Sequence, residues 1–170
     1  MIDTKDRPAA SPFSVVQSKA QEAPIAIPAM GLDLFVRMPP AASGGLMSII
    51  ETINAPGKGP PRHRHPETEI FRVLEGRYLY ELAGRRFYAE AGDVVSIPGN
   101  VEHGFVNVTD RPARQYIVIT PALDAAAFFT GLADVMRNGI PDPDILNAFG
   151  RQWQVDFLGP PVSRTDLPTP

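Results

Sequence analysis

The stretch Gly57-Lys-Gly-Pro-Pro-Arg-His63-Arg-His65-Pro-Glu-Thr-Glu69-Ile-Phe-Arg-Val-Leu-Glu-Gly76 decides the fold of this chain. A second stretch, Gly92-Asp-Val-Val-Ser-Ile-Pro98-Gly-Asn100-Val-Glu-His103-Gly-Phe-Val-Asn107, follows after fifteen residues. The chain has three histidines, and all of them lie in these two stretches. Residues i and i+2 of a β-strand point to the same face of the sheet. We therefore expect His63 and His65 to converge on one point while Arg62 and Arg64 point away from it.

The same residues predict a metal site. A single strand cannot surround a metal ion, so Glu69 and His103 must reach His63 and His65 from other strands of the folded sheet. Three neutral imidazoles and one carboxylate suit Fe, Mn, Ni, Cu or Zn, whereas Ca and Mg prefer oxygen ligands. Four ligands leave two positions of an octahedral ion open, as in a catalytic site. The competing interpretation, a solvated surface turn around Pro66, does not explain the glutamate or the separate spacing of the second stretch.

The two stretches resemble the two sequence motifs of the cupin superfamily. The first matches G-x5-H-x-H-x3-E-x6-G at every fixed position: Gly57, His63, His65, Glu69 and Gly76. The second resembles G-x5-P-x-G-x2-H-x3-N through Gly92, Pro98, His103 and Asn107, but Asn100 replaces its second glycine. Because Asn tolerates a left-handed backbone, we predict that this turn is retained. The resemblance implies one bound metal, but it does not imply one reaction, because cupins include dioxygenases, isomerases, epimerases, decarboxylases and non-catalytic proteins.

The predicted fold is all-β, a double-stranded β-helix or jelly-roll (cupin) barrel with a short C-terminal helical extension. Short segments separated by Gly-bearing turns predict strands over residues 32–38, 46–53, 69–74, 77–82, 85–89, 93–97 and 115–120. We expect an N-terminal arm over residues 1–30, the barrel over 31–121, and C-terminal helices and a tail packed on it over 122–170. Asp124 and Asp142 are predicted N-caps, and Gly150 is predicted to end the second helix. This end resembles the C-terminal extension of small bacterial cupins described as quercetin-dioxygenase-like, and we expect its helices to have no chemical role.

Strand periodicity also predicts a pocket beside the metal. If Glu69 and His103 point inward, then so do Phe71 and Val73 on one strand and Phe105 and Asn107 on the other. Further members come from one of two faces of residues 46–53, either Met47, Ile49 and Ile53 or Ile50 and Thr52, and the sequence does not choose between them. Tyr78 and Tyr80 share a face. The result is an apolar, partly aromatic cavity of the kind that binds small molecules.

Composition restricts the function classes. The 170-residue chain is 44% hydrophobic and 21% charged, as expected of one globular domain. A net charge of -3 gives no basic face for nucleic acid. Arginines alternate with Glu67, Glu75 and Glu81, which predicts a charged outer face. No cysteine is available for a disulfide or a thiolate site.

Two expectations concern location and assembly. No apolar run approaches the length of a signal peptide core or a membrane span, so we expect a cytoplasmic protein with no membrane partner. The proline-rich first thirty residues are open to two interpretations, a disordered leader or an arm that crosses to a second subunit. The cupin resemblance implies the second, and with it a homodimer.

The predicted function is that of a metal-dependent dioxygenase acting on a small aromatic or enol/diketone-type molecule. Glu69 is also the candidate catalytic residue, since a carboxylate that leaves the metal can carry a proton. Two alternatives stay open: a cupin that binds a metal and a small molecule without catalysis, and a zinc isomerase or epimerase. A serine hydrolase is not favoured, because no Gly-x-Ser-x-Gly occurs and every histidine is assigned to the metal.

Overall fold

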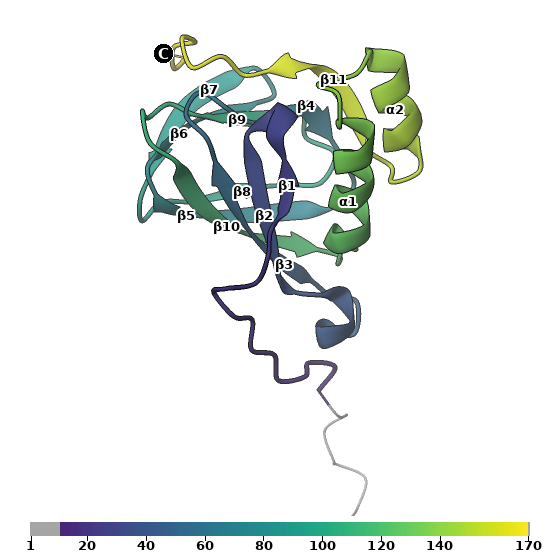
Figure 1. Ribbon diagram of the computed structural model, residues 1–170. Coiled ribbons are helices and arrows are strands. Elements are labelled where there is room, and N and C mark those ends of the chain that lie inside the picture. The colour runs from purple at the N-terminus through teal and green to yellow at the C-terminus, as the bar shows by residue number, and fades with distance from the viewer. Residues whose placement is uncertain (1–10, 170) are drawn as a thin grey trace, which may run out of the picture.

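The computed structural model describes residues 11–169, and the first ten residues of the predicted arm lie outside that range. Two antiparallel sheets pack face to face, with two helices on one side (Figure 1). The six-stranded sheet has the order β1 (Ile25–Ile27), β2 (Leu32–Met38), β3 (Ser48–Asn54), β10 (Ala113–Thr120), β5 (Thr68–Glu75) and β8 (Val94–Ile97). The five-stranded sheet has the order β11 (Asp156–Pro161), β4 (Pro61–Arg64), β9 (His103–Asn107), β6 (Arg77–Leu82) and β7 (Arg85–Glu90).

The all-β class and the helical extension are confirmed, but the predicted closed barrel is wrong. Among the described residues, no hydrogen-bonded ladder joins an edge strand of one sheet to an edge strand of the other. On one side the helices occupy the gap, because α1 (Ala125–Val135) contacts β1 and α2 (Pro143–Arg151) contacts β11. In addition, β11 ends in two prolines, which have no N–H with which to extend the sheet. The molecule is therefore an open sandwich of two sheets.

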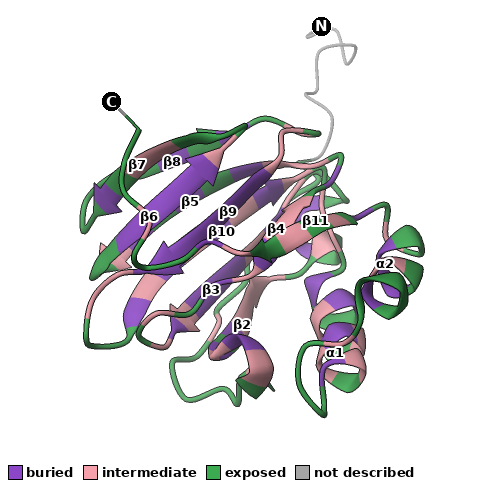
Figure 2. Ribbon diagram, turned by 90° about the horizontal axis from the view of Figure 1, so that it is seen from above, coloured by how far each residue is buried: buried purple, intermediate pink, exposed green. Residues whose placement is uncertain are grey.

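The core lies between the two sheets, and many residues of their strands are buried (Figure 2). Along β10 every second residue is buried, which is the period of a strand with one covered face. The predicted inward direction of Phe71 and Val73 is confirmed, and so is the shared face of Tyr78 and Tyr80. Rings from both sheets meet in this core, for example Phe71 and Tyr80 with centroids 5.5 Å apart. All seven predicted strands are present with small shifts of their ends, whereas β1 and β11 lie in segments expected to be an arm and an extended tail.

The turn before β9 is retained without the second glycine of the motif. Asn100 has a φ of 66°, as predicted, and its backbone N–H donates to the carbonyl of His65 at 2.7 Å. The closer approach occurs one residue earlier, where a Cβ on Gly99 would lie 1.9 Å from the carbonyl oxygen of Pro66. The turn therefore requires glycine at position 99, where there is no room for a side chain, and it accepts asparagine at position 100.

Both helices begin after the predicted N-cap residues, although the side chain of Asp142 makes no cap hydrogen bond, and α2 ends differently from the prediction. Asp124 caps α1, because its Oδ1 accepts from the backbone N–H of Ala127 at 3.1 Å. The prediction that Gly150 ends α2 is wrong, because the helix continues to Arg151. A Cβ on Gly150 would lie 2.3 Å from the carbonyl oxygen of Val155, so glycine is needed there for close packing.

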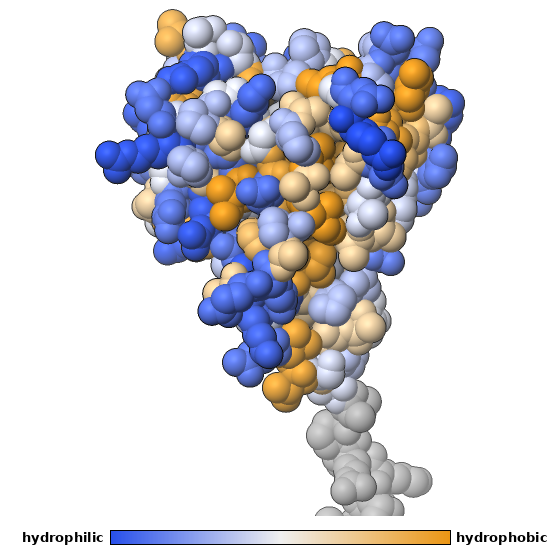
Figure 3. Space-filling view, in the orientation of Figure 1, coloured by the Kyte–Doolittle hydropathy of each residue, from blue (hydrophilic) through white to orange (hydrophobic). Residues whose placement is uncertain are grey.

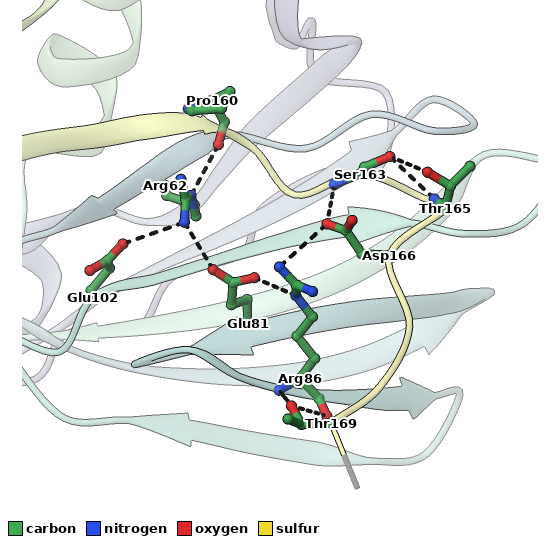
Figure 4. A network of polar contacts seen from close by, with 9 residues as sticks. All are labelled: Arg62, Glu81, Arg86, Glu102, Pro160, Ser163, Thr165, Asp166 and Thr169. Atoms are coloured by element: carbon green, nitrogen blue, oxygen red, sulfur yellow. Dashed lines mark hydrogen bonds and ion pairs between the residues drawn. The ribbon is translucent and has the colours of Figure 1, made fainter.

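The C-terminal tail crosses the outer face of the five-stranded sheet, where a charged network holds it (Figure 4). Glu81 lies at its centre and accepts from Arg62 Nη1 at 3.2 Å and from Arg86 Nε at 2.5 Å. Arg86 also pairs with Asp166 at 3.7 Å, while Arg62 Nε donates to the carbonyl of Pro160 at 3.3 Å. Arg62 therefore points away from the sheet interior, as predicted. Glu81 lies on this charged outer face, as predicted, but it is buried beneath the tail.

The described part of the N-terminal arm leaves the body beside the loop between β2 and β3. This loop contains a short 3-10 helix, η3 (Pro40–Ser43) (Figure 1). The backbone N–H of Ser14 donates to the carbonyl of Ala42 at 2.8 Å, and Arg37 donates to the carbonyl of Lys19 at 2.9 Å. Apolar side chains remain on this face of the molecule (Figure 3), and Val15 is fully exposed. The expected homodimer stays a prediction. No helix in residues 11–169 is long and apolar enough to cross a membrane.

Candidate metal centre

The four predicted residues meet between the two sheets. His63 on β4 is paired with His103 on β9, and Glu69 reaches them from β5 of the opposite sheet. His65 directly follows β4. One nitrogen of each imidazole and one carboxylate oxygen of Glu69 lie within 4.8 Å of one another, a grouping that could hold a metal ion. Glu69 Oε2 is 3.0 Å from His103 Nε2 and 3.4 Å from His65 Nε2.

The outer nitrogen of each imidazole is held by an acceptor. Nδ1 of His63 donates to the carbonyl of Pro61 at 2.7 Å, and Nδ1 of His103 donates to the carbonyl of Val101 at 2.8 Å. Nδ1 of His65 contacts the carboxylate of Glu67 at 3.1 Å. A ring nitrogen that donates to a carbonyl carries the hydrogen, so Nε2 of a neutral ring is left with its lone pair. Metal-binding histidines commonly have this arrangement.

The electrostatics of the cluster follow from its burial and its carboxylates. Burial, together with the neighbouring His103 and His65, lowers the pKa of His63 to about 3, so this ring stays neutral. Burial alone would lower the pKa of His65, but its hydrogen bonds to Glu67 and Glu69 raise it to about 10. Burial would raise the pKa of Glu69, but hydrogen bonds from His103 and His65 hold it far below its usual range. The cluster without metal therefore holds a carboxylate beside a protonated His65.

These features fit a divalent transition metal. Nitrogen lone pairs and a carboxylate oxygen that face one another repel unless a cation lies between them. Borderline cations accept imidazole and carboxylate together, so the donor set suits Fe, Mn, Ni, Cu or Zn and does not decide among them. The proton of His65 has to leave for the ion to bind.

A pocket opens directly from the cluster, with a cavity volume of ≈ 80 Å³, enough for several water molecules. One wall comes from the inner face of β3, through Ile50, Thr52 and Asn54, which resolves the choice left open by the sequence. Leu123, Phe128, Phe129 and Leu132 line another wall. The latter three belong to α1, so the C-terminal helices shape the pocket instead of only covering the sheets.

Two contributors to the site were not identified from the sequence. Glu67 was assigned to a charged outer face, but it lines the pocket and holds His65. A detectable signal was its place between two predicted ligands, since metal-binding imidazoles are often held by a carboxylate. Asn54 had no signal, because it lies just beyond the predicted strand. Asn107, the last residue of the second motif, is structural: its Nδ2 donates to the carbonyls of Asn54 and Arg111 at 3.0 and 2.7 Å.

This arrangement defines an open β-sandwich with a buried three-histidine, one-glutamate cluster at the end of a small-molecule pocket. Residues 51–119 match the family model described as "Cupin domain". That match includes all four cluster residues. The matched segment is less than half of the chain, and the match supports a cupin domain over those residues.

Three similar proteins illustrate the range of relatives. The chain is 36% identical over 81 residues to "Polyketide synthase CurC" from Streptomyces cyaneus, covering 47% of this chain and 51% of that protein. A predicted oxalate decarboxylase from Thermotoga maritima has a TM-score of 0.58 at 22% identity, covering 63% of this chain and 98% of that one. KdgF from Halomonas sp. has a TM-score of 0.51 at 18% identity, covering 56% and 84% of the two chains. The chain spans 51% and 58% of the length of the curated relatives it matches. At these identities the two structures show the fold alone, and the quercetin-dioxygenase-like subtype stays a prediction.

Proposed function

We propose that this protein is a metal-dependent dioxygenase that acts on a small organic molecule with an aromatic or enol/diketone group. One observation carries the proposal: three imidazoles and one carboxylate converge at the end of an apolar pocket. Four protein ligands leave room on an octahedral ion for a substrate oxygen and a second small ligand. A cluster with a purely structural role would have no need of an adjoining pocket.

The roles of the chain's own residues follow from their positions. A redox-active ion in this cluster would supply Lewis acidity and electron transfer toward dioxygen. The carbonyls of Pro61 and Val101 orient His63 and His103, and Glu67 orients His65. Phe128 and the other apolar side chains of the pocket limit the access of water.

Glu69 is the candidate proton carrier. Its carboxylate lies 3.0 Å from His103 Nε2, and its low pKa keeps it ionised at neutral pH. An ionised carboxylate can take the proton of an enol or of a carbon between two carbonyls, and it is better placed for this than any exposed base. The low pKa makes it a weak base, so the substrate must present an acidic proton. Enols and 1,3-diketones do so.

The relative named as a polyketide synthase supports the same substrate class. Polyketides have carbonyl groups on alternate carbons and readily form enols. That relative matches over half of its length, so its substrate is a guide for this proposal only.

An oxygen-independent zinc isomerase or epimerase is the second candidate. The same carboxylate favours it, because proton transfer next to a polarised carbonyl needs no oxidant. The four donors suit zinc as well as iron. A binding protein without catalysis is the remaining outcome.

One experiment separates the three functions. The purified protein is analysed for metals, stripped, and reloaded without oxygen with Fe(II), Mn(II), Ni(II), Cu(II) or Zn(II). Oxygen uptake and product formation are then measured with flavonols, catechols and 1,3-diketones. We expect uptake with at least one redox-active metal and none with zinc. Product formed with zinc in the absence of oxygen would indicate the isomerase, and binding without product under every condition would indicate the binding protein.

A further inference from the structure

The pocket is polar at both ends and apolar between them. The polar residues that line it form two groups. The cluster side chains and Glu67 lie at one end, and Thr52 and Asn54 of β3 lie at the other. Among the described residues, no lysine or arginine lines it. A phosphate or a remote carboxylate in this pocket would lose its hydration, face Glu67 and Glu69, and meet no protein cation. Such a group is unfavourable without a partner charge.

Asn54 offers a free hydrogen-bond donor. Asn54 is 1% exposed, and its Oδ1 accepts from Tyr78 Oη at 3.1 Å and from Thr52 Oγ1 at 3.4 Å. Both contacts use the oxygen of the amide, and within residues 11–169 Nδ2 has no hydrogen-bond partner. The backbone of Asn54 is held in place by Asn107. Asn54 lines the pocket and its Nδ2 is not fully buried, so an acceptor on a ligand in the cavity can accept a hydrogen bond from it.

The two polar groups are separated by the length of a small elongated molecule. His103 belongs to the metal end, and Asn107, four residues further along β9, bonds the backbone of Asn54. Four residues of a strand span about 13 Å. Ile50, Phe71 and Phe105 line the pocket over this interval, and a cavity of ≈ 80 Å³ along it is narrow. The space therefore favours a flat and slender body.

We propose that the pocket selects an uncharged, flat, elongated molecule that presents a chelating oxygen to the His/Glu cluster and a hydrogen-bond acceptor to Nδ2 of Asn54. The chelating end rests on the proposed function, and the far end adds Asn54 as the residue that determines specificity. A 1,3-diketone joined through one aromatic ring to a para carbonyl presents these two groups at its opposite ends.

The test uses binding, so it does not depend on turnover. The probes are 1-phenylbutane-1,3-dione and its para-acetyl and para-carboxylate derivatives, titrated by calorimetry into zinc-loaded protein without oxygen. The acetyl derivative is expected to bind about five- to tenfold more tightly than the parent, the usual effect of one neutral hydrogen bond. The carboxylate derivative is expected to bind at least about tenfold more weakly than the parent.

Variants assign the effect to Asn54. Asn54→Asp keeps the oxygen that accepts from Tyr78 and Thr52 but replaces the N–H donor by a second acceptor, so it should remove the preference for the acetyl derivative over the parent. Asn54→Leu should remove the same preference, although it also loses the acceptor for Tyr78. Ile53→Val on the outer face of the same strand is the matched control and should keep the preference. If Asn54→Leu does not fold, the three-probe comparison on the unaltered protein still decides. Equal binding of parent and acetyl probes, or carboxylate binding as tight as the parent, would overturn the inference. Absence of oxygen uptake with every metal would refute the dioxygenase and leave these ratios unchanged.

Discussion

Metal binding to this cluster should depend on pH in a way that an ordinary histidine site does not. His65 lies between Glu67 and Glu69, at 3.1 and 3.4 Å, and these carboxylates raise its pKa from 6.5 to about 10. At any pH below 10 the cluster without metal therefore holds a proton that the incoming ion must displace. His63, with a pKa of about 3, releases none.

The magnitude follows from one displaced proton. Each unit by which the pH falls below 10 weakens apparent metal affinity about tenfold, or about 1.4 kcal/mol. Between pH 8.5 and 6.5 the dissociation constant for Co(II) should rise about 100-fold. At pH 8 binding should release about one proton. A histidine of ordinary pKa, near 6.5, would give affinity that is nearly constant above pH 7.5.

Calorimetry measures both quantities when the Co(II) titration is repeated in two buffers of different ionisation enthalpy. Glu67→Gln removes one of the two carboxylates, so it should reduce proton release at pH 8 and flatten the pH dependence. Glu102→Gln, which changes a glutamate that is 42% exposed, should do neither. Affinity that is constant between pH 7.5 and 8.5, with no proton released, would refute the reasoning about His65.

Further predictions concern the ligands, the fold and the pocket. His103→Ala should reduce the bound metal per chain to less than about one tenth, because the site loses one of four donors and the residue that contacts the carboxylate of Glu69. Circular dichroism should show that the sheets stay intact. Without metal, stability in urea should decrease by up to about 1.4 kcal/mol per unit as pH falls from 6.5 toward 4.5, because the unfolded chain takes up a proton on His63 that the buried ring does not. Below pH 4.5 the decrease should be steeper, because Glu69 also takes up a proton on unfolding. Above pH 6.5 His65 gives the opposite slope, since its stabilising proton is lost as pH rises toward 10, and a flat profile would contradict both. Phe128→Ala should cost about 3–5 kcal/mol and enlarge the pocket, and a loss below 1 kcal/mol would show that α1 is not packed there. Asn100→Gly should change stability by less than about 0.5 kcal/mol, whereas Asn100→Val should cost about 1–2 kcal/mol, and equal effects would contradict a left-handed turn.

The cluster could be predicted from the sequence because its spacing is local geometry. His63 and His65 are two residues apart on extended chain, so their shared direction follows from the strand period alone. Glu69 and His103 were nominated by residue type and spacing within the two stretches, and the cupin resemblance agreed with that choice. The meeting of these four residues across two sheets was then a consequence of the fold, not of any pattern within one strand.

Other features depend on tertiary context that a single sequence does not carry. The sequence of β11 disfavours a strand, because it contains Gly159, Pro160 and Pro161. The strand nevertheless forms by pairing with β4, which would otherwise be the edge of the sheet. Glu67 and Glu81 look like surface charges, and only the folded chain shows that one holds an imidazole and the other lies beneath the tail. The open sandwich arises in the same way, since α1 and α2 fill the side at which a barrel would close.

The cluster lies at a strand of the open sandwich that is weakly paired with its neighbours. β4 is only four residues long, and its pairing with β9 consists of the single pair His63 and His103. On its other side β11 pairs with it through two register shifts. An ion bound to His63, His65 and His103 of one sheet and to Glu69 of the other would connect the sheets at this weakly paired strand. At a free metal concentration 100 times the dissociation constant, binding adds about 2.7 kcal/mol to stability. Amide hydrogen exchange should therefore slow most in β4 when metal is added, and equal slowing throughout both sheets would indicate global stabilisation without this connection.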